Sequence, residues 1–145
     1  ITDSEYMNYI LYNPNENKLY FTDKLLPKTL FFYKGDKLPN TKIVYKIFKN
    51  AETILGHICN KLVYKTEKYE IAFYYSKDLK IDPKYFKNFT YLNKNKNTEI
   101  MKSIFLKQIV TTKNYIATTV ASKIIFVKIS DKEFIKPLHE IIKEQ

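Results

Sequence analysis

The chain has 145 residues, of which 25 are basic and 15 acidic, so its formal net charge is +10. Its 45% hydrophobic content is that of a folded globular protein, and no run of about 18 apolar residues predicts a membrane-spanning helix. A single cysteine, Cys59, excludes an internal disulfide, and with only His57 and His139 beside it the chain cannot complete a cysteine-based zinc site. We expect one domain over residues 1–145.

From the N-terminus onward, the residue pattern predicts strands, because β-branched, aromatic and apolar residues alternate with polar ones. The predicted strands cover residues 5–12, 18–22, 29–34, 41–49, 53–66, 69–76, 104–112 and 115–129. Turn-forming residues stand at 13–17, 35–36, 67–68 and 113–114. No helix of about 10 to 15 residues separates the strands, so an antiparallel meander is expected.

Two short helices and one loop are predicted between and after these strands. An Asp-Pro pair at 82–83 predicts a short helix over residues 83–88. The polar segment 93–97 is typical of an exposed loop tip. Near the C-terminus, Ser130 and Glu133 have the spacing of a capping box. A second helical turn is expected to contain Pro137, Leu138, Ile141 and Ile142.

The predicted fold is therefore mainly β (α+β). We expect a single curved antiparallel sheet or half-barrel of about seven or eight strands, with one or two short helices covering part of it.

The positive charge is concentrated in parts of the chain, and all of the basic residues are lysines. Residues 84–114 hold seven lysines against Glu99 alone, a net charge of +6, and residues 34–61 hold six lysines against two acidic residues, a net charge of +4. The absence of arginine removes the side chain best suited to grip guanine edges and phosphates, and the abundance of lysine is typical of an A/T-rich coding sequence. The pattern predicts a local electrostatic patch.

Residues that could carry enzymatic chemistry are few. His57 and Cys59 are two positions apart on a predicted strand, so their side chains share a face, but a small buried cysteine beside a surface histidine explains the pair more simply than a catalytic site. Asp78 and Asp82 are interpreted as capping residues, and His139 as a solvated helix residue. With two glycines the chain has no phosphate-binding loop. We predict a protein that is not an enzyme, with no cofactor and no metal.

Three kinds of binding site remain open. A curved sheet could enclose an apolar ligand, for which the candidate lining residues are Tyr45, Ile47, Phe73, Tyr75, Ile109, Ile116 and Val120. An exposed sheet edge could pair with a protein partner. Single-stranded nucleic acid is the least favoured ligand, and would require Lys94, Lys96 and Lys102 to form a stripe beside exposed tyrosines. The same three lysines are the candidates for contact with an anionic surface.

Four blocks of the chain resemble a known family. ETILGHICNKL at 52–62 is similar to a K-x-I-x-G-x-x-C-x-K-A strand, and YEIAFYYSKDLKIDP at 69–83 to an x-A-W-Y-T-x-E-I-x-I-x-P strand. A third block consists of FLKQIV at 105–110 and YIATTVASKI at 115–124, and it resembles an LPLKI…FTITSTATKI hairpin. The fourth block, SDKEFIKP at 130–137, resembles a closing D-x-x-x-F-x-x-P motif. These are features of the GLPGLI family and related small envelope proteins of Bacteroidota. The Gly-Leu-Pro-Gly-Leu-Ile motif itself is absent, and YFKNF stands in its place at 85–89.

The resemblance implies an exported protein of the periplasm or cell envelope, whose export signal is not seen in the sequence from Ile1 onward. It also implies, by analogy, the half-barrel of the lipoprotein carriers LolA and LolB. The family has no assigned activity. The function expected is a non-enzymatic envelope protein that binds an apolar small molecule, a lipid or a lipidated envelope protein on the concave face of its sheet, with the basic segment against an anionic membrane surface. The oligomeric state is left open.

Overall fold

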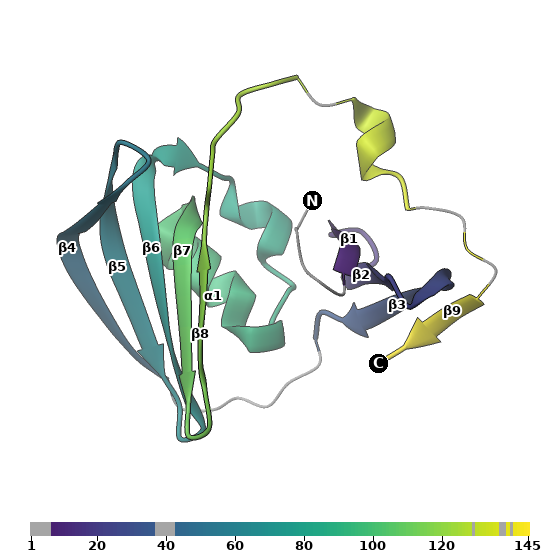
Figure 1. Cartoon of the computed structure of the whole chain (residues 1–145), viewed down its shortest axis with the longest axis horizontal. Coiled ribbons are helices and arrows are strands. Elements are labelled where there is room, and N and C mark those ends of the chain that lie inside the picture. The colour runs from purple at the N-terminus through teal and green to yellow at the C-terminus, as the bar shows by residue number, and fades with distance from the viewer. Residues whose placement is uncertain (1–6, 37–42, 129, 137–138, 140) are drawn as a thin grey trace. The chain divides into compact units, whose positions relative to one another are not determined.

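The computed structural model describes residues 7–36, 43–128, 130–136, 139 and 141–145 (Figure 1). Within them the chain is mainly β, which confirms the predicted fold class. The contacts divide the chain into two compact units, each built from separate stretches of sequence. Unit 1 comprises residues 1–38, 85–96 and 127–145, and unit 2 comprises 39–84 and 97–126. The expectation of one domain over 1–145 stays a prediction.

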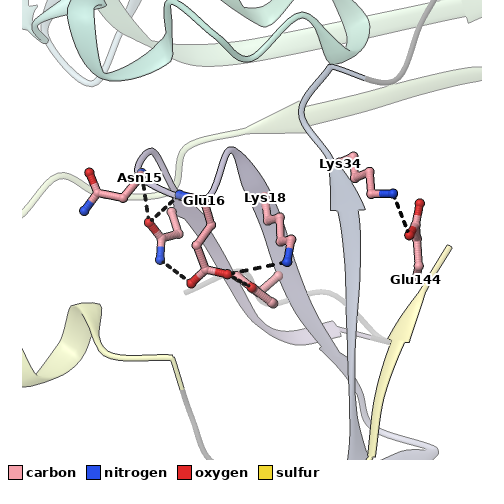
Figure 2. A network of polar contacts seen from close by, with 7 residues as sticks. Asn15, Glu16, Lys18, Lys34 and Glu144 are labelled. Carbon is pink, nitrogen blue, oxygen red and sulfur yellow. Dashed lines mark hydrogen bonds and ion pairs between the residues drawn. The ribbon is translucent and has the colours of Figure 1, made fainter.

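Unit 1 contains a four-stranded sheet in the order β1-β2-β3-β9. Its strands are β1 (Met7–Asn13), β2 (Lys18–Asp23), β3 (Leu26–Lys34) and β9 (Ile141–Glu144). The first three are antiparallel neighbours, whereas β9 lies parallel to β3. An ion pair of 3.1 Å between Lys34 and Glu144 joins these last two strands (Figure 2). In the β1–β2 turn, the Glu16 carboxylate accepts a hydrogen bond from the side-chain amide of Asn13. Its other oxygen lies 3.6 Å from Lys18 Nζ, which forms an ion pair (Figure 2).

One face of the unit 1 sheet carries a continuous stack of seven aromatic rings. Neighbouring ring centroids lie 4.4 to 6.3 Å apart with interplanar angles of 9 to 22°. The order of the rings is Phe86, Tyr12, Phe89, Tyr91, Tyr33, Phe21 and Phe31. Three of them come from the segment containing the 3-10 helices η1 (Pro83–Phe86) and η2 (Tyr91–Asn93). This segment therefore packs on the sheet by aromatic contact.

Unit 2 contains a five-stranded antiparallel sheet in the order β4-β5-β6-β7-β8 (Figure 1). The strands are β4 (Val44–Ile54), β5 (His57–Lys65), β6 (Tyr69–Lys80), β7 (Ser103–Thr112) and β8 (Ile116–Val120). Each strand pairs with the next along the chain. Short turns join the paired strands, except that the connection between β6 and β7 includes α1 (Lys94–Met101).

Each face of the unit 2 sheet carries a core cluster. One contains Leu62, Tyr64, Ile71, Phe73 and Tyr75, against which Met101 at the end of α1 packs. The other contains Ile54, Cys59, Ala72, Tyr74, Leu79 and Leu106. Side chains alternate along a strand, so β6, which is buried on both faces, contributes to both clusters.

The structure corrects several predicted elements. The strands form two sheets, where the sequence predicted one, and β9 adds a parallel pair. The strand predicted over 53–66 is interrupted by a tight turn at Leu55 and Gly56, whose φ angles of 50° and 80° suit a hairpin turn. The strand predicted over 115–129 ends at Val120.

The helices differ from prediction as well. The segment 93–97, predicted as an exposed loop, contains the start of α1, and Asn97 is 1% exposed because tertiary packing outweighs its polarity. A short helix after Asp82 is confirmed as η1, and η3 (Asp131–Phe134) begins after Ser130, which accepts a hydrogen bond from the Lys132 amide. The prediction of a second helical turn near the C-terminus is wrong, since Ile141 and Ile142 belong to β9. Pro137 and Leu138 lie outside the described residues.

Candidate functional site

The residues predicted to line an apolar concavity lie on opposite faces of the unit 2 sheet. Paired residues of antiparallel strands point to the same face, so the strand register assigns each residue to a face. One face carries Tyr45, Ile47, Phe73 and Tyr75, and the other carries Ile109, Ile116 and Val120. Phe73 and Tyr75 are buried in the core, whereas Ile116 is 71% exposed. The seven residues therefore do not line one cavity, which corrects the prediction.

The three lysines predicted to contact an anionic surface have different surroundings. Lys94 is half-buried at the start of α1, its Nζ 5.6 Å from the centroid of the Phe86 ring, and burial lowers its pKa. Lys96 is exposed on the same helix, but residues two positions apart on a helix do not share a face. Lys102 is exposed just after the helix. Lys94 and Lys96 therefore do not form the stripe that the nucleic-acid hypothesis requires.

Two hollows in unit 2 are lined by a mixture of charged, polar and apolar residues. One, of about 440 Å³, is lined by residues that include Lys49, Asn60, Ser76, Lys77 and Asp78. The other, of about 500 Å³, is lined by Val44 and Val63 together with Lys46, Lys65, Thr66, Glu67 and Glu70. Neither contains a residue of the predicted apolar set. An apolar ligand would meet charged groups in both.

The arrangement around His57 and Cys59 does not suit nucleophilic catalysis. The two share a face, as predicted, but the Cys59 thiol is fully buried and donates to the His57 carbonyl oxygen at 3.4 Å. Burial raises the pKa of Cys59, which disfavours the reactive thiolate. His57 Nδ1 lies 3.7 Å from Asp78 Oδ2, and the buried Ser76 hydroxyl donates to that same oxygen at 3.1 Å. The serine therefore contacts the carboxylate and not an imidazole that could take its proton.

The edge strand β8 offers a different kind of site, made of backbone groups. The N–H of Thr112 donates to the Tyr115 oxygen at 2.9 Å, and the N–H of Ala121 donates to the Leu106 oxygen at 2.7 Å. Hydrogen-bonded pairs alternate along an antiparallel ladder, so the intervening residues that bond to β7 are Ala117 and Thr119. The N–H and C=O groups of Ile116, Thr118 and Val120 consequently point away from β7, toward the free edge.

Nothing in β8 protects this edge from pairing. Its sequence, Ile-Ala-Thr-Thr-Val, contains no charge, proline or glycine, its register with β7 is regular, and all five residues are exposed. The opposite edge strand, β4, has a register shift between Phe48 and Glu52 and carries Lys46 and Lys49. Bulges and charged residues are the usual means of preventing edge-to-edge pairing. By this criterion β8 is the open edge of the unit 2 sheet.

Ile116 and Val120, two of the three residues whose backbone groups point to the free edge, are predicted from the sequence as site residues, but of an apolar cavity. Thr118, the third, is not predicted. The available signal was the uncharged, β-branched run between Lys113 and Lys123. What it could not give was the hydrogen-bonding partner of each residue, since that depends on the register with β7.

Comparison of the chain with protein-family models, with curated proteins and with solved structures finds no match in any of the three. The similarity to the GLPGLI family therefore stays a prediction. Within the described part of the chain, no helix has the length and apolar character needed to cross a bilayer. The same residues contain no group of three or more His, Cys, Asp or Glu side chains placed to hold a metal ion.

Proposed function

We propose that this protein is a non-enzymatic binding module that adds a strand of a partner protein to the β8 edge of its unit 2 sheet. The observation that carries the proposal is the row of outward backbone groups at Ile116, Thr118 and Val120 on an exposed strand without charge, proline or bulge. This is the protein-interaction alternative predicted from the sequence. A location in the periplasm or cell envelope belongs to the proposal too, and is supported by the family resemblance alone.

Strand addition would use the backbone for affinity and the side chains for selectivity. A partner strand that is antiparallel to β8 could exchange both N–H···O bonds with Ile116, Thr118 and Val120. The side chains of these three residues share one face, where Ile116 and Val120 are 71% and 52% exposed. Apolar or β-branched residues at alternate positions of the partner would cover them.

The apolar-ligand function predicted from the sequence has less support. Its candidate lining residues divide between two faces, and the lining of each hollow described above includes lysine together with aspartate or glutamate side chains. The chemistry around His57 and Cys59 likewise gives no support to an enzymatic function.

The proposal is tested with proline substitutions at adjacent positions of β8. Thr118→Pro removes an outward N–H and places a ring at the free edge, yet keeps the bonds to β7, because proline is tolerated where an edge-strand N–H faces solvent. Thr119→Pro removes an N–H that bonds to β7, so it is the variant expected to damage the hairpin. Circular dichroism and thermal unfolding should therefore show a wild-type fold for Thr118→Pro.

Binding is measured by amide NMR with a neutral capped heptapeptide, Ser-Val-Thr-Val-Thr-Val-Ser, added to the whole chain. We expect the amides of Ile116, Thr118 and Val120 to shift and to exchange more slowly with solvent when the peptide is added. Thr118→Pro should abolish the effect. Unchanged β8 amides at millimolar peptide, or equal binding by a folded Thr118→Pro variant, would overturn the proposal.

A further inference from the structure

We infer, on the basis of the proposed function, that the partner strand is acidic: an extended segment of about five uncharged residues with carboxylates at both ends. The charge of the segment that contains the β7–β8 hairpin carries the inference. Residues 100–130 contain five lysines and no aspartate or glutamate. The open edge therefore belongs to a segment of one sign of charge, although β8 itself is uncharged.

Two of the five lysines flank the open edge. Lys113 precedes Ile116 by three residues in the β7–β8 turn, and Lys123 follows Val120 by three residues. Both are exposed, and no ion pair involving either is found among the residues that the structure describes. An acidic residue just beyond each end of a paired strand would approach one of these ammonium groups.

Lys107, on the adjacent strand, is not available in the same way. Its Nζ donates to both oxygens of Glu52, at 3.0 and 2.8 Å, so its charge is already balanced. Among the residues described, the lysines nearest to β8 that carry no such pair are thus Lys113 and Lys123, at its two ends, and they set the positions of the acidic residues in the partner strand.

A second copy of this chain fits the edge less well. Antiparallel pairing of β8 with itself about Thr118 would bring the turn that contains Lys113 in one copy to the end of β8 that Lys123 follows in the other. Both positions are lysine, so each end of such a dimer would bring two like charges together. In an acidic partner strand, a carboxylate would stand at each of these ends in place of the second lysine.

The experiment compares three capped nonapeptides with the whole chain. All share the centre Val-Thr-Val-Thr-Val, flanked on each side by two Glu, two Gln or two Lys residues. Binding is followed by titration calorimetry and by the amide signals of β8. We expect the Glu peptide to bind about tenfold more tightly than the Gln peptide at low salt, and the difference to shrink as salt is raised past the point where the Debye length is about 8 Å. The Lys peptide should bind most weakly.

A charge variant and its matched control identify the site. Replacing Lys113 and Lys123 by Gln should remove the advantage of the Glu peptide while leaving the affinity for the Gln peptide unchanged. Replacing Lys46 and Lys49 by Gln makes the same change of net charge on the opposite edge strand, and should leave the advantage in place. An advantage that follows net charge in both double variants would overturn the inference.

The remaining outcomes separate the inference from the proposed function. If the Glu and Gln peptides bind equally and Thr118→Pro blocks both, the inference fails while strand addition stands. If no peptide shifts the β8 amides, both fail. A dimer seen by analytical ultracentrifugation and abolished by Thr118→Pro would make a second copy the occupant and overturn the inference. The same applies if a polyanion without a peptide backbone, such as heparin, competes fully with the Glu peptide.

Discussion

Lys107 Nζ lies 3.0 and 2.8 Å from the two carboxylate oxygens of Glu52, although their strands, β7 and β4, are separated in the sheet by β5 and β6. The ammonium also lies 4.7 Å from the centroid of the Tyr74 ring on β6, so a cation–π contact accompanies the ion pair. The hydrogen bonds to Glu52 raise the pKa of Lys107. The pair thus connects distant strands across one face of the unit 2 sheet.

Replacing Glu52 by Gln should lower the free energy of unfolding by about 1 kcal/mol at pH 7, as for a well-formed but partly exposed ion pair. Because the pKa of Lys107 is raised in the folded protein, the contribution of the pair is fully present below the unfolded pKa of lysine, and is lost as pH rises through the higher folded pKa. Urea unfolding of both proteins at pH 7 and at increasing alkaline pH measures this. Glu67→Gln, at an exposed turn position, is the control, and a difference that persists at the highest pH would contradict the expectation.

Tyr20 should also make stability depend on pH in the alkaline range. Burial first, and then its hydrogen bond to Glu16, raise the pKa of Tyr20 from 10.0 to about 12. Between these two values the unfolded chain has lost the phenolic proton and the folded chain keeps it, so stability should fall as pH rises.

Tyr20→Phe should show a shallower fall of stability over that window, by up to about 1.4 kcal/mol per pH unit. Unfolding of the two proteins at pH 9, 10 and 11 provides the comparison, and Tyr115→Phe, at an exposed position, serves as the control. Equal slopes for wild type and Tyr20→Phe would show that Tyr20 does not titrate as described. In the same variant the pKa of Glu16 should rise, because its hydrogen bond to Tyr20 is the main cause of its lowered pKa.

Gly35→Ala should destabilise unit 1 through a steric clash. A methyl group at this buried position would lie 2.0 Å from Asn17 Oδ1 and 2.9 Å from the Asn17 backbone oxygen, which accepts the Gly35 N–H at 2.7 Å. The backbone oxygen cannot move without breaking that bond, so we expect a loss of about 2 kcal/mol. At Gly56 the φ of +80° would strain an alanine, but no atom beyond the two neighbouring residues lies within 4 Å of the added methyl group. Gly56→Ala should therefore cost only about 1 kcal/mol. Chemical denaturation of both variants ranks them, and the reverse order would contradict the prediction.

Cys59 should be unreactive in the folded protein. It is fully buried, and burial raises the pKa of its thiol, so little thiolate is exposed to a reagent. Iodoacetamide at pH 8 should leave the native chain unmodified and alkylate it quickly in denaturant, as read by mass spectrometry. Rapid labelling of the native protein would mean that the thiol is more accessible than its position on β5 implies.

Elements whose signal is local can be predicted from the sequence. The strands around Lys18–Asp23 and Tyr69–Lys80 follow from alternation, and the turns at 13–17, 35–36, 67–68 and 113–114 follow from turn-forming residues. Elements that depend on long-range contacts cannot be predicted in this way. Residues 94–97 lack a helical pattern of apolar residues, which predicts a loop, yet they begin α1, in which Thr98 and Met101 are buried.

By itself, the sequence determined that this is a mainly β protein, that its charge is carried by lysine, and that an uncharged, strand-forming run lies in an acid-free segment between Lys113 and Lys123. These properties depend on residue type and on spacings of a few residues. The folded arrangement is needed to show that this run is an edge strand, that Ile116 and Phe73 lie on opposite faces, and that the backbone groups of Thr118 point outward. The physical reason is that face and edge are set by the register between paired strands, and a shift of one residue in that register would exchange every side chain between the two faces.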